Sequence, residues 1–168
     1  YNHSKKIAIE AIDDSHVNKY LDARNRGSNL SNMTEIEKVS RISHYIWWLK
    51  NERSSFILKK NHNNLLYIWH QLKTVNEVQV LIGGWFPISE NCSSLDVNYA
   101  LNWQLEYSSI HFPNIPWVAV IKKTNKFVKL LNQRFGFKII REDDKFFVIT
   151  NKCFPSAQTS DFDYFLKK

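Results

Sequence analysis

The stretch "TNKFVKLLNQRFGFKII", Thr124–Ile140, carries the most information about the fold. Asn125 is a favourable helix N-cap, and Gly136 suits the left-handed position that often follows a helix C-terminus. Apolar residues recur between them at helical spacing: Val128, Leu131 and Phe135. Phe137 then returns the chain to a core. We therefore predict a helix that begins after Asn125 and ends before Gly136, and a strand over 137–143.

Similar patterns extend in both directions from this stretch. Alternating or continuous apolar runs predict strands over 6–12, 54–60, 65–73, 77–88, 116–123 and 145–151. Helical spacing predicts helices over 13–25, 34–51 and 89–110. The helix over 34–51 would bury the face formed by Ile36, Val39, Ile42, Ile46 and Leu49. The tail, 160–168, would add a strand or a helical turn.

Two short segments predict local backbone geometry. The Asn-rich segment 61–64 lies between two strands and predicts a hairpin turn. Gly83-Gly84, at the end of a strand, predicts a bulge or a close approach of two backbones. Together the elements predict a mixed α/β (α+β) domain that spans residues 1–168.

Composition restricts the class of protein. The chain has 168 residues, 43% of them hydrophobic and 14% aromatic, with a formal net charge of +7. No apolar run reaches the length of a membrane span, and two cysteines are too few for a disulfide framework. No Cys/His cluster suggests a metal, so we expect none, and we expect a cytoplasmic protein. The positive charge favours anionic partners such as nucleotides.

The segment "WVAVIKKTNKFVKLLNQRFGFKII" resembles the GCN5-related N-acetyltransferases, in which a buried strand precedes Asn, an amphipathic helix, Gly-Phe and another strand. The element order along the whole chain is similar too. The resemblance implies a mixed sheet with splayed central strands and helices on both faces. It also implies an N-acetyltransferase that uses acetyl-CoA as cosubstrate.

The resemblance also implies where acetyl-CoA would bind. Backbone groups of the strand around Gly84, Trp85 and Phe86 would hold the pantetheine arm. Polar residues before the next helix would hold the diphosphate: Ser89, Asn91, Ser93 and Ser94. Asn125 and Lys129 would also contact the cosubstrate, the latter in a basic patch with Lys122, Lys123 and Lys126. The loop from Pro87 to Ser94 lacks the family's glycines, so it binds the diphosphate differently, binds it weakly, or serves another purpose.

The residues implied for catalysis depart from the family's pattern. Asn132 stands where many relatives have the Tyr that protonates the leaving thiolate, and apolar Leu81 stands near the usual Glu base. His70 and His111 are the alternative bases by their chemistry, and Tyr99 or Tyr107 the alternative acids. Turnover would then depend on a bound water, on His70 or on His111.

The acceptor pocket is implied by a second resemblance. The segment "YLDARN…ISHYIWW" is similar to the N-terminal helices of amino-sugar and ribosomal-protein N-acetyltransferases. His44 and Trp48 would contact the acceptor, whereas Trp47 would lie in the core. An amino sugar attached to a nucleotide is the expected acceptor.

Three other functions remain open from the sequence. The chain could be a catalytically degenerate module of the same fold, or an acyltransferase directed at proteins or nucleic acids. It could also bind nucleic acid without catalysis, although its lysines are scattered and form no recognition motif. We expect a small-molecule amine as partner, no membrane and no nucleic acid, with a homodimer left open.

Overall fold

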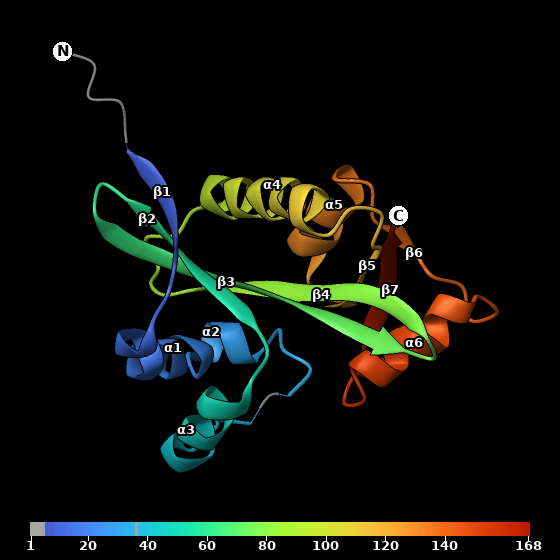
Figure 1. Cartoon of the computed structure of the whole chain (residues 1–168), viewed down its shortest axis with the longest axis horizontal. Helices are drawn as coiled ribbons and strands as arrows, with labels where there is room; N and C mark the ends of the chain where they lie inside the picture. Colours follow the sequence, from blue (N-terminus) through green and yellow to red (C-terminus); the bar gives the residue numbers. More distant parts are fainter. Residues whose placement is uncertain (1–5, 36) are drawn as a thin grey trace.

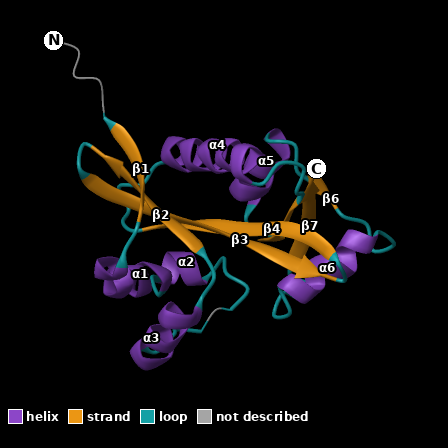
Figure 2. Cartoon of the chain, in the orientation of Figure 1, coloured by secondary structure: helices purple, strands orange, loops and turns teal. Residues whose placement is uncertain are grey.

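A seven-stranded mixed sheet forms the centre of the protein (Figures 1 and 2) in the computed structural model, which describes residues 6–35 and 37–168. The strands lie in the order β1-β2-β3-β4-β5-β7-β6, and β4 and β5 form the only parallel pair among the described residues. In chain order they are β1 (Ile7–Ala11), β2 (Ser54–Lys60), β3 (Asn63–Val75), β4 (Val78–Pro87), β5 (Trp117–Lys122), β6 (Lys138–Ile139) and β7 (Phe162–Lys167).

Helices cover both faces of this sheet. They are α1 (Val17–Arg24), α2 (Gly27–Leu30), α3 (Arg41–Lys50), α4 (Ser94–His111), α5 (Lys126–Arg134) and α6 (Lys145–Cys153), with a short 3-10 turn at Asp14–His16. In Figure 1, α4 and α5 lie above the sheet and α1, α2 and α3 lie below it. The largest core cluster joins Tyr20 of α1 and Ile149 of α6 to the lower face, so α6 covers that face too.

The two hairpins are closed by residues in the left-handed region. Asn61 and His62 have φ angles of 51° and 69°, and Asn76 and Glu77 have φ angles of 50° and 63°. Two consecutive positive φ values define the turn whose twist matches that of paired strands, and Asn tolerates this region better than most residues. The hairpin predicted at 61–64 is confirmed, with β3 beginning at Asn63.

The helix predicted to begin after Asn125 and to end before Gly136 is confirmed as α5. The Asn125 side chain caps α5 by accepting a hydrogen bond from the Val128 N–H at 3.4 Å. Gly136 has a φ of +95°, which residues with a side chain rarely adopt. Phe137 is buried with Phe165 in the core beneath the helix. Local signals therefore determine both ends of this helix.

The central strands separate, as predicted. β4 and β5 pair at one position only, Leu81 with Trp117, where the Leu81 N–H donates to the Pro116 carbonyl oxygen at 2.9 Å. β3 and β4, in contrast, pair without a register shift from Leu66–Pro87 to Val75–Val78. The predicted α/β class, splayed sheet and helices on both faces are therefore confirmed. Of the two geometries predicted for Gly83-Gly84, the structure has the close backbone approach, to Trp69 of β3, and not the bulge.

Two predictions for the C-terminal third differ from the structure. The strand predicted over 137–143 is limited to the two residues of β6, Lys138–Ile139. The segment predicted as a strand over 145–151 is helix α6. Asp144 caps it by accepting from the Phe146 N–H, and its buried side chains recur at helical spacing: Phe146, Ile149, Thr150 and Cys153. A short β-branched apolar run fits both periods. The tail supplies the missing strand as β7, which lies between β5 and the two-residue β6.

The helix predicted over 34–51 begins only at Arg41, where Ser40 caps it. Ile36, one residue of its predicted apolar face, lies outside the described residues. Ile42, Ile46 and Leu49 are exposed by 75%, 53% and 83%. The helix instead buries His44 and packs Trp47 and Trp48 against Tyr20. Aromatic contacts with α1 therefore decide which face of α3 turns inward.

Candidate functional site

A cavity of about 910 Å³ lies where β4 and β5 separate. Its walls come from β3, β4 and β5, from α4 and α5 on the upper face, and from the segment around α2 on the lower face. Trp85 of β4, Asn132 of α5 and Trp69 of β3 all contribute to it. A volume near 1,000 Å³ is in the range of sites for small molecules and cofactors. The gap between the strands therefore continues as a site that reaches both faces.

The parity of β4 decides which backbone groups face this gap. Alternate residues of a strand direct their N–H and C=O groups to opposite neighbours. The Leu81 N–H points to β5, and the Ile88 N–H donates to the carbonyl oxygen of Leu65 in β3. Gly83 and Trp85 therefore present their backbone groups to the gap. Gly84 and Phe86, although both line the cavity, direct theirs to β3, which corrects the sequence-based assignment of their backbone groups.

Gly83 is the closest backbone approach in the site. A methyl group on its Cα would lie 2.7 Å from the Trp69 carbonyl oxygen, 2.8 Å from Gln104 Nε2 and 2.8 Å from the Trp117 ring. Gln104, a buried residue of α4, donates from Nε2 to that same carbonyl at 2.8 Å. The absence of a side chain at Gly83 therefore lets α4, β3 and β5 meet at the point where the gap opens.

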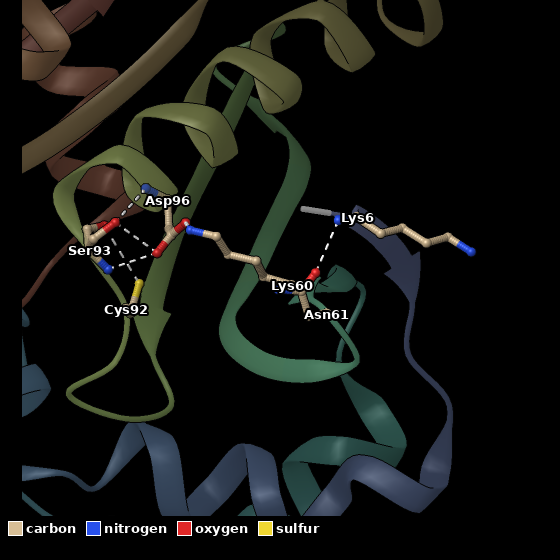
Figure 3. A network of polar contacts seen from close by, with 6 residues as sticks. All are labelled: Lys6, Lys60, Asn61, Cys92, Ser93 and Asp96. Carbon is tan, nitrogen blue, oxygen red and sulfur yellow. Dashed lines mark hydrogen bonds and ion pairs between the residues drawn. The ribbon is translucent and has the colours of Figure 1, made fainter. Parts of the chain in front are cut away.

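The N-terminus of α4 is occupied by the chain's own carboxylate (Figure 3). Asp96 Oδ2 accepts from the backbone N–H and the hydroxyl of Ser93, both at 2.8 Å, and the Ser93 hydroxyl accepts from the Asp96 N–H. Lys60 reaches from the β2–β3 hairpin to Asp96 Oδ1 at 3.1 Å. This capping box uses the groups that a helix N-terminus would otherwise offer to an anion.

Asp96 is a buried anion. Burial raises the pKa of its carboxyl, but the hydrogen bonds from Ser93 and the ion pair with Lys60 outweigh burial, so the pKa lies below its usual value. The carboxylate therefore stays charged at neutral pH. The carboxylate already uses the Ser93 donors that a diphosphate would need, so the chain's residues fit the pantetheine arm of acetyl-CoA in the gap and do not fit its diphosphate at this helix end.

The other residues predicted for the diphosphate lie outside the large cavity. Ser89 and Asn91 line a separate small polar pocket beside the β2–β3 hairpin. Lys129 forms an ion pair with Asp163 at 2.7 Å, and Lys123 pairs with the same carboxylate at 3.0 Å. The predicted basic patch is thus partly neutralised. Ser93 and Ser94 form the start of α4 and do not line the cavity either.

The histidines predicted as bases do not line the cavity. His70 lies on the α4 face of β3 among Phe56, Tyr107 and Phe112, and its ring nitrogens have no hydrogen-bond partner in the described residues. His111 stacks on Tyr107 near the end of α4. Tyr99, on the same helix, is 45% exposed. Their placement gives a role in acetyl transfer no support.

Asn132 is the predicted catalytic residue that does line the cavity. It is buried, and its side-chain amide donates to the Val128 carbonyl oxygen at 2.8 Å within α5. One amide hydrogen remains beyond that bond, which permits a hydrogen bond to a ligand atom and no proton transfer. Asn125 also lines the cavity from the start of the same helix.

The two tryptophans of α3 exchange their predicted places. Trp47 lines the cavity, whereas Trp48 does not and donates from its indole to Asp14 at 2.9 Å. His44 lines the cavity, as predicted, and its Nε2 bonds to the Val17 carbonyl oxygen at 2.7 Å. Because a carbonyl can only accept, Nε2 carries the hydrogen. Burial lowers the pKa of His44, which keeps the ring neutral near pH 7.

Apart from Lys122, which was predicted as part of the basic patch, sequence reasoning missed the charged residues of the lower half of the cavity. Four cationic side chains line it together with one carboxylate: Arg24, Arg53, Lys73, Lys122 and Glu35. They come from α1, the turn before β2, β3, β5 and the segment after α2. The sequence offered one signal for this cluster: Lys73 alternates along β3 with Trp69 and Gln71, so the three side chains lie on the same face of the sheet. Convergence of the rest depends on the tertiary fold.

No protein-family model matches the chain, and no curated protein matches its sequence. Solved structures do match. A domain from Methanocaldococcus jannaschii has a TM-score of 0.74 at 15% identity, covering 98% of this chain and 99% of that one. A GCN5-related N-acetyltransferase from Kribbella flavida has a TM-score of 0.70 at 9% identity, covering 96% of each chain. An aminoglycoside acetyltransferase in complex with coenzyme A has a TM-score of 0.68 at 7% identity, covering 97% of this chain and 95% of that one. This protein therefore has the GCN5-related N-acetyltransferase fold.

Two general features complete the description. No helix in the described ranges combines the length and apolarity needed to cross a membrane. Within those same ranges, no group of three or more His, Cys, Asp or Glu side chains could hold a metal ion.

Proposed function

We propose that this protein transfers an acetyl group from acetyl-CoA directly to the primary amine of a small molecule, with a nucleotide-linked amino sugar as the first candidate acceptor. The single pairing of Leu81 with Trp117, which opens β4 and β5 into the cavity, is the observation that carries the proposal. An open strand edge inside a site is rare, because unpaired backbone groups normally find partners. The structurally similar aminoglycoside acetyltransferase, whose structure contains coenzyme A, supports the choice of cosubstrate.

The reaction needs little covalent help from the protein. The amine nitrogen bonds to the thioester carbonyl carbon and loses a proton, while the C–S bond breaks and the thiolate takes up a proton. The backbone N–H groups of Gly83 and Trp85 face the gap and can donate to the carbonyl oxygen as charge develops there. Holding donor and acceptor in one cavity supplies proximity.

His44 is the histidine among the described residues that lines the cavity, and its neutral ring leaves Nδ1 as a lone-pair acceptor. It therefore replaces His70 and His111 as the side chain proposed to take the amine's proton, alongside a bound water. Asn132 can orient the leaving sulfur by one hydrogen bond.

Mass spectrometry of products tests the proposal. The protein should acetylate members of a panel of amino-sugar nucleotides, polyamines and peptides, at a rate that rises with pH as the amine deprotonates.

His111→Ala and Tyr99→Phe should change the rate less than about twofold, since both side chains lie outside the cavity. Asn132→Ala should lose one neutral hydrogen bond, worth on the order of 1 kcal/mol. Acetylated peptide without acetylated small molecules would overturn the proposed acceptor class.

The filled N-terminus of α4 leads to a prediction about the donor. S-acetylpantetheine should replace acetyl-CoA with a KM within about tenfold, because the N-terminus of α4 is already occupied by Asp96 and cannot recognise the diphosphate. Asp96→Asn should lower the KM for acetyl-CoA more than that for S-acetylpantetheine, at a stability cost of about 1–2 kcal/mol from the weakened cap. Glu90→Gln removes a charge from the same loop without touching the cap and serves as control. A KM for acetyl-CoA a hundredfold below that for acetylpantetheine would contradict the prediction.

A second candidate function is a binding module without catalysis. Asp96 at the anion-binding helix end and Asn132 in the place of a proton donor favour it. Calorimetric titration with acetyl-CoA separates the candidates: a protein that binds acetyl-CoA but acetylates nothing in the panel is such a module.

A further inference from the structure

The lower half of the cavity contains a guanidinium held between aromatic rings. The Arg53 guanidinium carbon lies 3.6 Å from the centre of the Trp69 ring and 5.0 Å from that of Trp47. Its one side-chain hydrogen bond within residues 6–35 and 37–168 is a long one, 3.4 Å, to the Tyr20 hydroxyl. A guanidinium has five N–H donors, so most of its donors have no protein partner in this part of the chain.

Arg53 also lacks a counter-charge. No described carboxylate lies within the 4.0 Å of an ion pair from Arg53 or from Lys73. The cavity's one carboxylate, Glu35, is 65% exposed and lies 3.9 Å from Arg24 instead. Partly buried cations are usually paired, because desolvation is costly without an opposite charge. The lower half of the cavity therefore has an excess of positive charge that the protein does not neutralise.

The position of Arg53 links it to the reacting end of the site. A Cβ on Gly84 would lie 3.0 Å from the Trp69 indole nitrogen, so the Trp69 ring lies against β4 beside the open strand edge. Arg53 stacks on that ring. An anion bound by Arg53 is thus close to β4, on the face opposite α4. The Trp47 ring already packs against Tyr20, His44 and the Arg53 guanidinium, which favours charge over stacking on Trp47 as the basis for selecting a ligand.

We propose that Arg53, supported by Lys73 and Arg24, binds an anionic group of the acceptor, a carboxylate or a phosphate, and so selects amines that carry a negative charge. The inference rests on the proposed acetyl transfer and names the class of acceptor for it. Arg53 acts here as a specificity residue: its planar fork can hold two oxygens of one anion while Trp69 fixes its plane.

Matched acceptors with and without the charge test this inference. Phenylalanine is compared with phenylalaninamide for the carboxylate, and glucosamine 6-phosphate with glucosamine for the phosphate. In at least one pair, the wild-type protein should prefer the charged member by tenfold or more in kcat/KM. Arg53→Gln should raise KM for that member at least tenfold and change the neutral member less than twofold. Arg53→Lys should restore part of the loss.

Arg141→Gln is the matched control, because the substitution removes the same charge from a side chain that is 84% exposed and lies outside the cavity. It should leave the preference intact. A binding experiment keeps the inference separate from the proposed activity: inorganic phosphate and acetate should change the tryptophan fluorescence of the wild type and not of Arg53→Gln. Fluorescence changes without acetylation of any amine would reject the proposed function and retain the anion site. Equal use of charged and neutral amines, or no fluorescence response to either anion, would overturn the anion site.

Discussion

Replacing His70 by leucine is expected to stabilise the protein by about 1–3 kcal/mol at pH 7. His70 is 1% exposed, and neither ring nitrogen has a hydrogen-bond partner in the described residues. Its neighbours are the rings of Phe56, Tyr107 and Phe112, which can contact an apolar side chain equally well. Leucine removes the buried unpaired N–H and lone pair that destabilise the native state. Urea unfolding at pH 7 measures the difference.

The same histidine should make the wild type sensitive to acid. Burial lowers the pKa of His70 to about 4, and the charge of His111 adds to the effect. Between about pH 6.5 and pH 4, the unfolded chain binds a proton at this ring and the native state does not. Stability is therefore retained above pH 6.5 and lost progressively as the pH falls toward 4, by about 3 kcal/mol for this group.

The pH dependence gives the His70 prediction its control. His70→Leu should flatten the acid limb of a plot of unfolding free energy against pH. His44→Leu should behave differently at pH 7 and destabilise, because His44 is equally buried but its Nε2 donates to the Val17 carbonyl oxygen. A His70→Leu variant that is less stable than wild type at pH 7, with an unchanged acid limb, would show that the ring has a partner after all.

Gly83→Ala is expected to destabilise the protein by about 1–3 kcal/mol, a fall in Tm of about 3–10 °C, and to abolish binding of acetyl-CoA. The new methyl group would lie less than 3.0 Å from each of three atoms. One of them is the backbone oxygen of Trp69, which cannot move without disturbing β3. Relief requires α4 or β5 to shift, and either shift changes the gap. Thermal unfolding and calorimetric titration with acetyl-CoA measure the two effects.

Two other glycines calibrate this prediction. Gly27→Ala places its methyl group where nothing lies within 4 Å, so it should be neutral or slightly stabilising in a helix. Gly84→Ala meets the Trp69 side chain at 3.0 Å and should have an intermediate effect, since a side chain yields more readily than a backbone. Wild-type stability and wild-type acetyl-CoA binding in Gly83→Ala would show that the gap does not depend on the absence of a side chain at Gly83.

Contiguous residues were sufficient wherever the structure depends on the local backbone. The Asn125 cap, the positive φ of Gly136 and the hairpin turn at Asn61 each require a residue type at one position, and that residue is visible in the sequence. The close approach at Gly83 was predicted for the same reason, because an absent side chain marks the place where backbones meet. Together with the element order, these signals indicated the fold class, whereas the separated strands were implied by the family resemblance.

The tertiary structure decided everything that depends on which partner a side chain meets. The run at 145–151 fits a strand or a helix, and burial of its Phe146 and Ile149 in one cluster with Tyr164 selects the helix. The aliphatic stripe of α3 predicted the wrong buried face, because contacts with Tyr20 hold the aromatic face instead. Neither outcome follows from periodicity, since the competing contacts lie far away in the chain.

The candidate site shows the same division. The family resemblance implied backbone contacts near Trp85 of β4, and the sequence by itself showed that the loop before α4 lacks the family's glycines. Only the fold brought Arg53 onto Trp69, paired Lys60 with Asp96 at the N-terminus of α4 and placed His70 outside the cavity. Helix caps and turns involve interactions over a few residues, whereas a charged site forms between residues that only folding brings together, so its physical cause is long-range packing.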